Sequence, residues 1–584
     1  MKGNTIKSSA RLEHFASLYK ESMLAASEEL DRLEKNMSQY LGSYEIDGGD
    51  RASTIRNITY EIIESQVNSD IPTPKVDSVC YSERRERNAH SIERLCSSVK
   101  DILPFEKMNE LDERYTYIYG ASVWYVEWDS DENDGGVKVH CTSPMNFLGQ
   151  AGISEIDEME YCFLRFTTTK GELMRKYRIS EADARLCDCE FEYDENPFSD
   201  TVNLVICFYK DDDGEIGKFV FSGELVLSDV ETYYRRKKKV CRICKSDYAE
   251  CACKDPDFET VDVYEEPVGD KTIPYYVPKH FPIIIRRNTM GSEGAFGGSD
   301  CERIRPQQQA INKIESRILQ KLLRAGITPI MPEDSMVTLT NAIFGQVIKM
   351  RPGESSDNYG KLDTTPDISQ DIEEADRLYD HAKRVLGISD ALQGTDTIVN
   401  ESGYARQLKI NQASSRLESK RRIKHHVYSR LYQLIFEHYL AFADTPRTLS
   451  YKDSFGKIHL AEFNRYDFIE KDKAENYFYE DGYLFSVDLN GGTEYSREML
   501  WEKNLANLES GTLGSKDDPV TLLRYWQSQE RAHYPYAREN VDYFKSIVEK
   551  QLSKEERENN KDEEKEPLCD LKHEAYCGTE EKLC

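Results

Sequence analysis

The longest helical pattern in the sequence covers residues 403–443 and contains no proline. Proline inside a helix removes a backbone hydrogen bond and clashes with the preceding turn, so its absence over such a length favours one continuous helix. A small, polar stretch at residues 387–402 precedes this pattern. We therefore expect the chain to be organised around one long helix, introduced by a polar loop.

Two shorter helical patterns come before that loop. Residues 299–326 and 367–386 carry apolar side chains at helical spacing, and each pattern ends next to a glycine, which commonly closes helices. The segment between them, residues 327–366, is bounded by proline and glycine and contains short extended pieces. Glycines clustered at residues 291–298 predict a flexible joint before the first helix.

The N-terminal 298 residues mix helical and strand periods. Helical spacing predicts helices within residues 1–45 and at residues 91–98, the latter with Ser91 as its cap. The period then changes to two, which predicts a β-hairpin over residues 115–141. In the first helical region the apolar positions are Leu12, Phe15, Leu18, Tyr19 and Met23. Because both helical and strand patterns occur in these residues, the predicted fold class is α+β.

The C-terminal part changes from strand patterns to helical patterns and then to a charged segment. Residues 444–496 return to strand patterns, and residues 497–552 are helical with an interruption near residues 511–519. The last segment, residues 553–584, is charged, acidic and poorly periodic, which predicts disorder.

The chain is strongly acidic, with 106 Asp and Glu against 77 Lys and Arg and a formal net charge of −29. Gripping DNA phosphates requires a basic surface, so this charge excludes a general nucleic-acid coat. The longest aliphatic cluster, Phe281–Ile285, is far shorter than the roughly 20 residues of a membrane-spanning helix. No secretory leader is visible, and we expect the 15 cysteines to be reduced in a cytosolic setting.

The strongest local motif is a group of four cysteines: Cys241, Cys244, Cys251 and Cys253. Four thiolates within such a short stretch predict a closed, tetrahedral structural Zn²⁺ site. The second half is C-x-C where C-x-x-C is usual, so the pattern is also consistent with free thiols in an exposed loop. A carboxylate such as Asp247 could replace one thiolate.

Two basic regions stand out in this acidic chain. Residues 235–239 read Arg-Arg-Lys-Lys-Lys, which indicates either a phosphate-contacting patch or a solvated hairpin tip whose charges offset nearby acids. Residues 402–447 hold nine basic and three acidic side chains. That excess indicates either charge pairing between subunits or a face towards nucleic acid.

Signatures of the common enzyme classes are absent from the sequence. It contains no P-loop, nucleophile elbow, metalloprotease helix motif or dinucleotide-binding fingerprint after a strand. His425 and His426 lie on a basic helical pattern and are interpreted as structural. The acidic runs at residues 129–134 and 211–213 occupy predicted turns, where Asp is favoured for backbone reasons. We expect no enzymatic activity.

Three groups of short stretches follow the order of these patterns: Tyr119–Trp128 with Ser143–Asn146; Gly297–Asp300 with Gln308–Ser316; and Leu386–Asp390 with Leu392–Gly394 and Glu401–Ala405. Their order and spacing resemble the portal proteins of tailed bacteriophages, and most closely those of long-tailed phages of Gram-positive bacteria. The resemblance covers about residues 10–550.

The resemblance implies a portal-type fold whose parts follow one another along the chain. These are the wing (1–298, with a Cys-rich knuckle insertion at 233–262), stem helix 1 (299–326), the clip (327–366), stem helix 2 (367–386), the tunnel loop (387–402), the long spine helix (403–443), further wing strands (444–496), the helical crown (497–552) and the acidic tail (553–584). The implied tunnel-loop residues are Gln393, Thr395, Asp396, Thr397 and Asn400, and the implied hinge glycines are Gly294, Gly297 and Gly298.

It further implies a ring of twelve copies at one vertex of a virion capsid, assembled in the host cytoplasm. Double-stranded DNA would pass through the ring during packaging and ejection. Its implied partners are terminase, the major capsid and scaffold proteins and a head-completion adaptor, with no membrane. A conduit needs a lumen that does not hold DNA, so the net charge of −29 fits a conduit and excludes a clamp. The alternatives are a zinc-containing nucleic-acid-processing enzyme and an intracellular scaffold.

Overall fold

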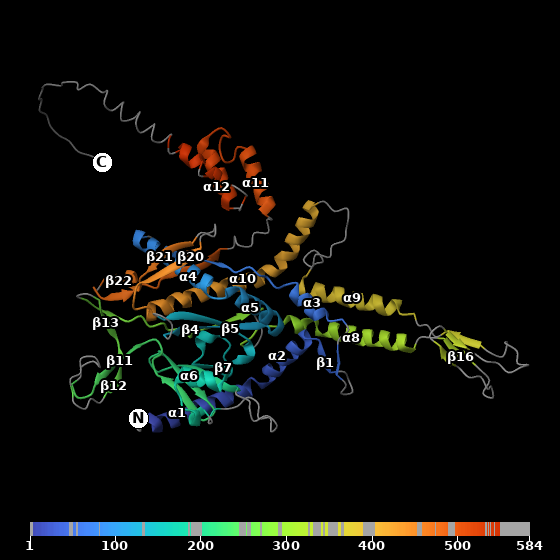
Figure 1. Ribbon diagram of the computed structural model, residues 1–584, viewed down its shortest axis with the longest axis horizontal. Coiled ribbons are helices and arrows are strands. Elements are labelled where there is room, and N and C mark those ends of the chain that lie inside the picture. The colour runs from blue at the N-terminus through green and yellow to red at the C-terminus, as the bar shows by residue number, and fades with distance from the viewer. Residues whose placement is uncertain are drawn as a thin grey trace, which may run out of the picture. The chain divides into compact units, whose positions relative to one another are not determined.

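The computed structural model contains helices and strands throughout the part of the chain it describes (Figure 1). The described residues are 4–45, 51–53, 56–80, 82–130, 135–184, 187, 201–244, 253, 258–268, 271–289, 295–324, 327–330, 340–342, 345–347, 360–363, 367–388, 403–452, 458–473, 475–488, 497–531, 534, 537, 539–541, 543–548 and 550.

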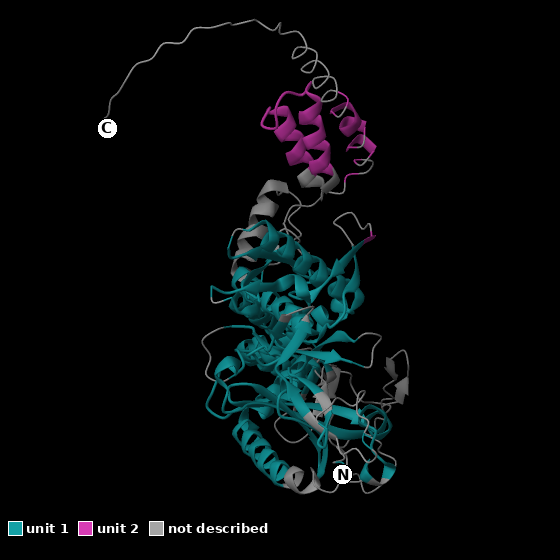
Figure 2. Ribbon diagram, turned by 90° about the vertical axis from the view of Figure 1, so that its left-hand side faces the viewer, with its two compact units in different colours: residues 1–451, 460–491 teal, residues 452–459, 492–584 magenta. Residues whose placement is uncertain are grey.

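The chain divides into two compact units (Figure 2). Unit 1 comprises residues 1–451 and 460–491, and unit 2 comprises residues 452–459 and 492–584. Both helices and strands contribute to unit 1, which confirms the α+β class. Among the helices of the described residues, none has the length and apolar character needed to cross a bilayer.

The N-terminal helices of unit 1 pack on a five-stranded antiparallel sheet with the strand order β10-β9-β8-β7-β6. The first helix uses the apolar side chains that its spacing predicted, with Phe15 buried and Leu12, Leu18, Tyr19 and Met23 half-buried against the same cluster. The elements are α1 (Asn4–Ala25), α2 (Ser27–Tyr40), β6 (Phe147–Gly149), β7 (Tyr161–Thr169), α6 (Lys170–Tyr177), α7 (Glu181–Ala184), β8 (Thr201–Lys210), β9 (Ile216–Ser222) and β10 (Leu225–Val230).

A second, three-stranded antiparallel sheet has the order β15-β4-β5, from β4 (Ala121–Asp129), β5 (Gly136–Thr142) and β15 (Ile283–Arg287). The predicted hairpin is present, but it begins later than residue 115. Residues 115–119 form the last turn of α5 (Phe105–Tyr119), and Gly120, with φ of +93°, closes that helix. Ser91 lies inside α4 (Glu83–Ile102) and is not its cap.

The long helix α10 (Gly403–Phe442) confirms the predicted continuous helix, and its 40 residues correspond to about 60 Å. Its C-terminal part is the centre of the main core, where Tyr428, Leu431, Tyr432 and Ile435 are fully buried. Helix α4, strands β4 and β5 and the strand pair β3 (Thr73–Ser78) with β24 (Tyr483–Asp488) supply much of the rest of this core.

His438 in this helix makes the stability of unit 1 sensitive to acid. The side chain is fully buried, with Nδ1 at 2.7 Å from the carbonyl oxygen of Leu434 and no hydrogen-bond partner for Nε2 among the described residues. Burial lowers its pKa to about 4. The unfolded chain, with a pKa of about 6.5, therefore binds more protons between these values, and stability is lost as the pH falls through that window.

We expect His438→Phe to remove this loss, because the aromatic surroundings accept a phenyl ring and the Leu434 carbonyl keeps its helical hydrogen bond. The free energy of unfolding of the variant minus that of the original chain is expected to be about 2 kcal/mol larger at pH 5 than at pH 7. Urea unfolding at the two pH values measures this. An equal difference at pH 5 and pH 7 would contradict the assignment.

Helices α8 (Asp300–Arg324) and α9 (Ser369–Leu386) lie side by side in Figure 1 and confirm the two helices predicted within residues 299–326 and 367–386. Ile311, Ile314, Ile318 and Ala375 join them through apolar contacts. The segment between them contains the strand pairs β16 (Ile327–Ile330) with β19 (Gly360–Asp363) and β17 (Thr340–Ala342) with β18 (Gly345–Val347). Its extended pieces are therefore confirmed.

The other elements of unit 1 are short and mostly form two-stranded pairs. They are β1 (Ser43–Glu45), β2 (Arg51–Ser53), α3 (Ile58–Glu64), β11 (Arg236–Cys241), β12 (Phe258–Val263), β13 (Glu265–Val268), β14 (Lys271–Pro274), β20 (Arg447–Lys452), β21 (Ile458–Phe463), β22 (Ile469–Lys471) and β23 (Tyr477–Tyr479), with 3-10 turns at Pro144–Asn146, Ile156–Glu158 and Arg465–Phe468. Strands β20 and β21 extend into the short part of unit 2 at residues 452–459.

Unit 2 contains α11 (Arg497–Glu509) and α12 (Pro519–Arg531). The predicted interruption lies between them: Gly511 and Gly514 have positive φ, and the Asp518 carboxylate accepts hydrogen bonds at the start of α12. The Gln529 side chain donates to the Trp501 carbonyl at 3.3 Å and ties the two helices together. The predicted disordered tail, 553–584, lies outside the described residues.

Candidate functional site

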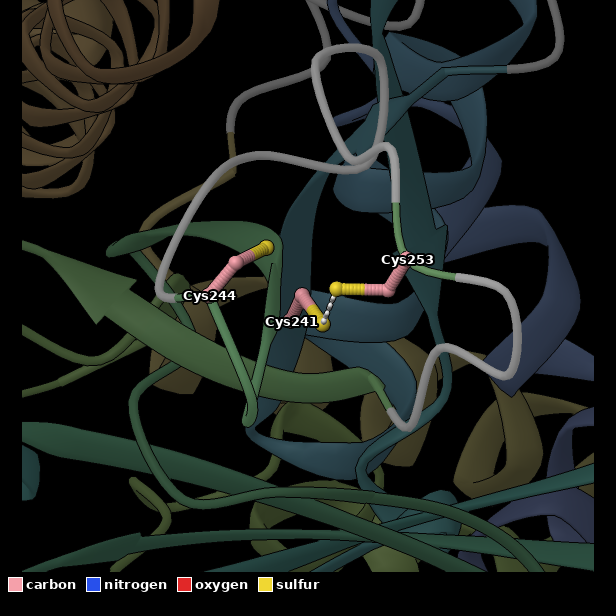
Figure 3. A group of neighbouring side chains, drawn as sticks. All are labelled: Cys241, Cys244 and Cys253. Carbon is pink, nitrogen blue, oxygen red and sulfur yellow. Dashed lines mark hydrogen bonds between the residues drawn. The ribbon is translucent and has the colours of Figure 1, made fainter.

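The cysteine motif brings three sulfur atoms together at one end of a hairpin (Figure 3). Cys241 is the last residue of β11, is fully buried, and pairs with Phe258 of β12. The Sγ atoms of Cys241, Cys244 and Cys253 all lie within 4.8 Å of one another, and those of Cys241 and Cys253 are 3.9 Å apart. Cys251 lies outside the described residues.

The distances between these sulfur atoms fit those of a metal site. Zinc–sulfur bonds of about 2.3 Å at tetrahedral angles place two sulfurs roughly 3.8 Å apart. The 3.9 Å between Cys241 and Cys253 agrees with that value and is far too long for a disulfide. Three convergent thiols could therefore hold a soft or borderline metal ion, and Cys251 is the candidate for the fourth position.

The basic run next to the cysteines is paired with acidic side chains. Arg235 forms an ion pair with Glu215, Arg236 lies 2.7 Å from an Asp444 oxygen, and Lys237 lies 4.0 Å from Asp262. Arg236 also donates to the carbonyl oxygen of Phe442 at the end of α10. These three charges offset nearby acids, as one of the two interpretations held, but residues 236–239 lie in strand β11 and not at a hairpin tip. Arg235 and Arg236 tie the start of the hairpin to other segments of unit 1, whereas the Lys237–Asp262 pair lies within the hairpin.

The glycine joint before α8 is closely packed. A Cβ atom on Gly297 would lie 2.8 Å from the Thr289 carbonyl oxygen and 2.9 Å from that of Gly120. Neither Gly297 nor Gly298 has a positive φ, so the unusual dihedrals expected of a hinge are not found there. Glycine is required at residue 297 because two backbone segments approach it. Gly294 lies outside the described residues.

Six buried charged side chains, which we call the junction cluster, lie where α5, β15, α8 and α10 meet. Two cation–carboxylate contacts join α10 to its neighbours: Lys420 Nζ lies 2.6 Å from an Asp300 oxygen and Lys424 Nζ lies 3.1 Å from a Glu113 oxygen. The members are Asp112, Glu113, Arg286, Asp300, Lys420 and Lys424. Three cations balance three carboxylates, so the cluster is neutral as a whole.

Further hydrogen bonds complete the cluster. Arg286 contacts both Asp112 and Glu113, and its nitrogen lies 2.8 Å from Glu113 Oε1. The indole N–H of Trp124 donates to Asp112 at 2.9 Å. Burial raises the pKa of Glu113, but Arg286 and Lys424 more than offset this and lower it to about 2. The carboxylate is therefore ionised at neutral pH and holds the middle of α5 and the end of β15 against α10.

The junction cluster shows which groups pair with two of the basic side chains of α10. Lys420 and Lys424 face neither a second subunit nor nucleic acid, because buried carboxylates of the same chain take up their charge. Arg422 pairs with Glu418 one turn earlier. For Lys420 and Lys424 both earlier interpretations are wrong, whereas the Arg422 side chain is 77% exposed and its pairing with Glu418 does not decide between them. Sequence spacing did not reveal the cluster, although a lysine in line with the buried stripe of α10 is a signal for such a pair.

The structure gives less information about the remaining predicted site residues. All five tunnel-loop residues, Gln393, Thr395, Asp396, Thr397 and Asn400, lie outside the described residues. The preceding Gly387 closes α9 with φ of +76°. In the acidic run 211–213, Asp211 Oδ1 accepts hydrogen bonds from the backbone N–H of Asp213 and Glu215, which is the turn role expected of it.

In the comparisons with known proteins, no family model matches the chain, and no curated protein matches it either.

Proposed function

We propose that the protein is the portal of a tailed bacteriophage, a non-enzymatic ring of twelve copies that forms a DNA channel at one capsid vertex. The observation that carries this proposal is the order of elements within one compact unit. Helix α8, a small β-containing segment, helix α9, the segment 387–402 and the 40-residue helix α10 follow in the order that the resemblance requires.

In this proposal α8 and α9 form the stem, residues 327–366 the clip and residues 387–402 the tunnel loop. Terminase and later a head-completion adaptor would dock on the clip, while the major capsid and scaffold proteins would surround the wing. The net charge of −29 supports a channel that lets DNA slide, because tight binding depends on cations that release counterions from DNA. The pairing of Lys420 and Lys424 within the chain leaves these two unavailable to grip DNA.

Negative-stain electron microscopy of the purified full chain tests the proposal. We expect closed rings with a central channel, and class averages that show rotational symmetry. The sample is imaged over a range of protein and salt concentrations, because ring closure depends on subunit concentration. A monomer or dimer under every condition would refute the portal.

We also propose that the cysteine cluster holds a structural Zn²⁺ ion, with Cys251 as the fourth ligand beside Cys241, Cys244 and Cys253. Four thiolates leave no open position for substrate, so the ion would close the loop between β11 and β12 and would carry no catalytic role. The 3.9 Å distance between two of the sulfurs supports this.

Elemental analysis is expected to find about one zinc per chain, lost in the double variant Cys241→Ser, Cys244→Ser. Both thiolates are ligands in this assignment, and a serine hydroxyl is a poor replacement. Cys80→Ser removes an exposed thiol elsewhere and should keep the metal. Equal zinc in the double variant and in the original chain would refute the site.

A further inference from the structure

A cavity of about 230 Å³ lies where α1 meets α2. Ala26 joins the two helices with helical dihedrals, and its N–H and C=O form helical hydrogen bonds with Ser22 and Leu30. The lining residues of this segment recur every three or four positions and therefore share one helix face. They are Ser22, Ala25, Ala26, Glu29 and Leu30. The two alanines are small, which leaves open space on a face that carries larger side chains on either side.

The opposite wall is the free edge of the five-stranded sheet. Phe147, Leu148 and Gly149 of β6 all line the cavity. Side chains of a strand alternate between its two faces, so a cavity that meets three consecutive residues lies at the edge of the strand. Strand β6 is the last in the order of this sheet. Backbone carbonyl groups on such an edge are available as hydrogen-bond acceptors.

The rest of the lining is apolar or consists of backbone. Residues 150–154 continue the wall that β6 begins, and Ala295 and Phe296 complete it. The rings of Phe147 and Phe296 meet edge to face at 6.1 Å, so they close one side of the cavity. An aliphatic chain could therefore be buried here against alanine, leucine and phenylalanine side chains.

Among the described lining residues, Glu29 carries the only charge. Its Oε1 lies 3.1 Å from Arg32 Nη2, while Nε of the same arginine lies 3.4 Å from a Glu302 oxygen. Burial raises the pKa of Glu29; Arg32 lowers it and Glu302 raises it again, and the net shift is upward. One guanidinium thus serves two carboxylates, and a further cation beside Glu29 would be stabilised.

The other arginines nearby do not reverse this balance. Arg287 donates to two backbone oxygens of the lining, but its Nη1 lies 2.6 Å from a Glu155 oxygen, so its charge is paired. Arg305 contacts Asn36, about two turns further along α2 than Glu29. An anionic ligand would therefore meet a carboxylate inside the cavity, whereas a cationic one would pair with it.

We propose that this cavity binds a small primary alkylammonium ion. The ammonium group would pair with Glu29 and donate its remaining N–H groups to carbonyl oxygens along the edge of β6, and the alkyl chain would lie against Ala26, Leu30 and Phe296. An ammonium group has three donors and no acceptor, which suits a carboxylate beside backbone carbonyls. The proposal goes beyond the portal function and does not depend on it, because one chain supplies every group.

Fluorine NMR with 4,4,4-trifluorobutylamine tests the proposal on the full chain, with 4,4,4-trifluorobutanol as the neutral and 4,4,4-trifluorobutanoate as the anionic probe. We expect saturable binding of the amine alone, weakened about five-fold by Glu29→Gln, as suits one partly exposed ion pair. The matched control is Glu28→Gln, which removes the same charge from the adjacent residue of α2, outside the cavity lining, and should leave binding unchanged.

A second variant, Ala26→Leu, tests the position of the ligand. It keeps Glu29 and places a larger side chain on the lining face, so binding of the amine should be lost.

Each other outcome overturns the proposal. Equal loss in the Glu29 and Glu28 variants would show that only general electrostatic attraction is measured. Unchanged affinity in Ala26→Leu would show that the amine binds outside the cavity. Tighter binding of the alcohol or of the butanoate would show that Glu29 does not select the ligand. Absence of saturable amine binding would show that the cavity takes no such ion, whether or not the protein forms rings.

Discussion

Replacing Arg286 by methionine is expected to lower the free energy of unfolding of unit 1 by about 3–5 kcal/mol. Arg286 is buried and forms contacts with Asp112 and Glu113. Without it, two buried carboxylates face the single ammonium group of Lys424, and one negative charge loses its compensation. Removing one partner of a buried ion pair is costly for this reason, whereas an exposed pair contributes little.

Urea unfolding followed by tryptophan fluorescence measures the loss, with Trp124 as a reporter because its indole donates to Asp112. The matched control is Arg422→Gln, which breaks the exposed pair with Glu418 and should cost less than about 1 kcal/mol. Adding Asp112→Asn to Arg286→Met removes the surplus charge and should recover more than half of the loss. A loss equal to that of the control would contradict the view that the junction cluster holds the elements together.

The long helices could be predicted from the sequence almost to the residue, and the reason is local. Helices α8, α9 and α10 have many turns, continuous apolar spacing and glycines near their ends, so local propensity and tertiary packing agree. Helix α5 was missed because its last turn, residues 115–119, alternates aromatic and β-branched side chains like a strand. Burial of Tyr117, Ile118 and Tyr119 decides its conformation, and that depends on the rest of the fold.

The candidate sites divide in the same way. The cysteine cluster was visible because its ligands lie within one short stretch, and the structure brings three of the four predicted residues together. The junction cluster was not visible, because its charges come from α5, β15, α8 and α10, which lie far apart in the chain. A buried lysine and an exposed lysine look alike in a sequence unless one checks whether the lysine is in line with buried residues of the same helix. Lys420, Lys424 and Tyr428 follow one another at intervals of four residues and occupy one buried face.

Gly120→Ala is expected to cost about 2–5 kcal/mol, from two contributions. Its φ of +93° disfavours any residue with a Cβ, which costs about 1–2 kcal/mol. The new Cβ would also lie 2.2 Å from the carbonyl oxygen of Gly297, and relief of such overpacking costs typically 1–3 kcal/mol more. Gly152→Ala is the matched control, because its φ is +81° and nothing lies within 4 Å of its Cβ, so it should cost only the first contribution.

The comparison of the two alanine variants by urea unfolding measures how tightly the joint is packed. The segment at residues 297–299 cannot yield easily, because Gly298 O accepts from the Asn288 side chain at 2.9 Å and the Ser299 hydroxyl donates to Ile118 O at 2.6 Å. Equal costs for the two variants would mean that this segment moves aside freely, as a flexible hinge would. A larger cost for Gly120→Ala would mean that α8 starts from a fixed point within unit 1, so any bending of α8 relative to the sheets of that unit must occur elsewhere in the chain.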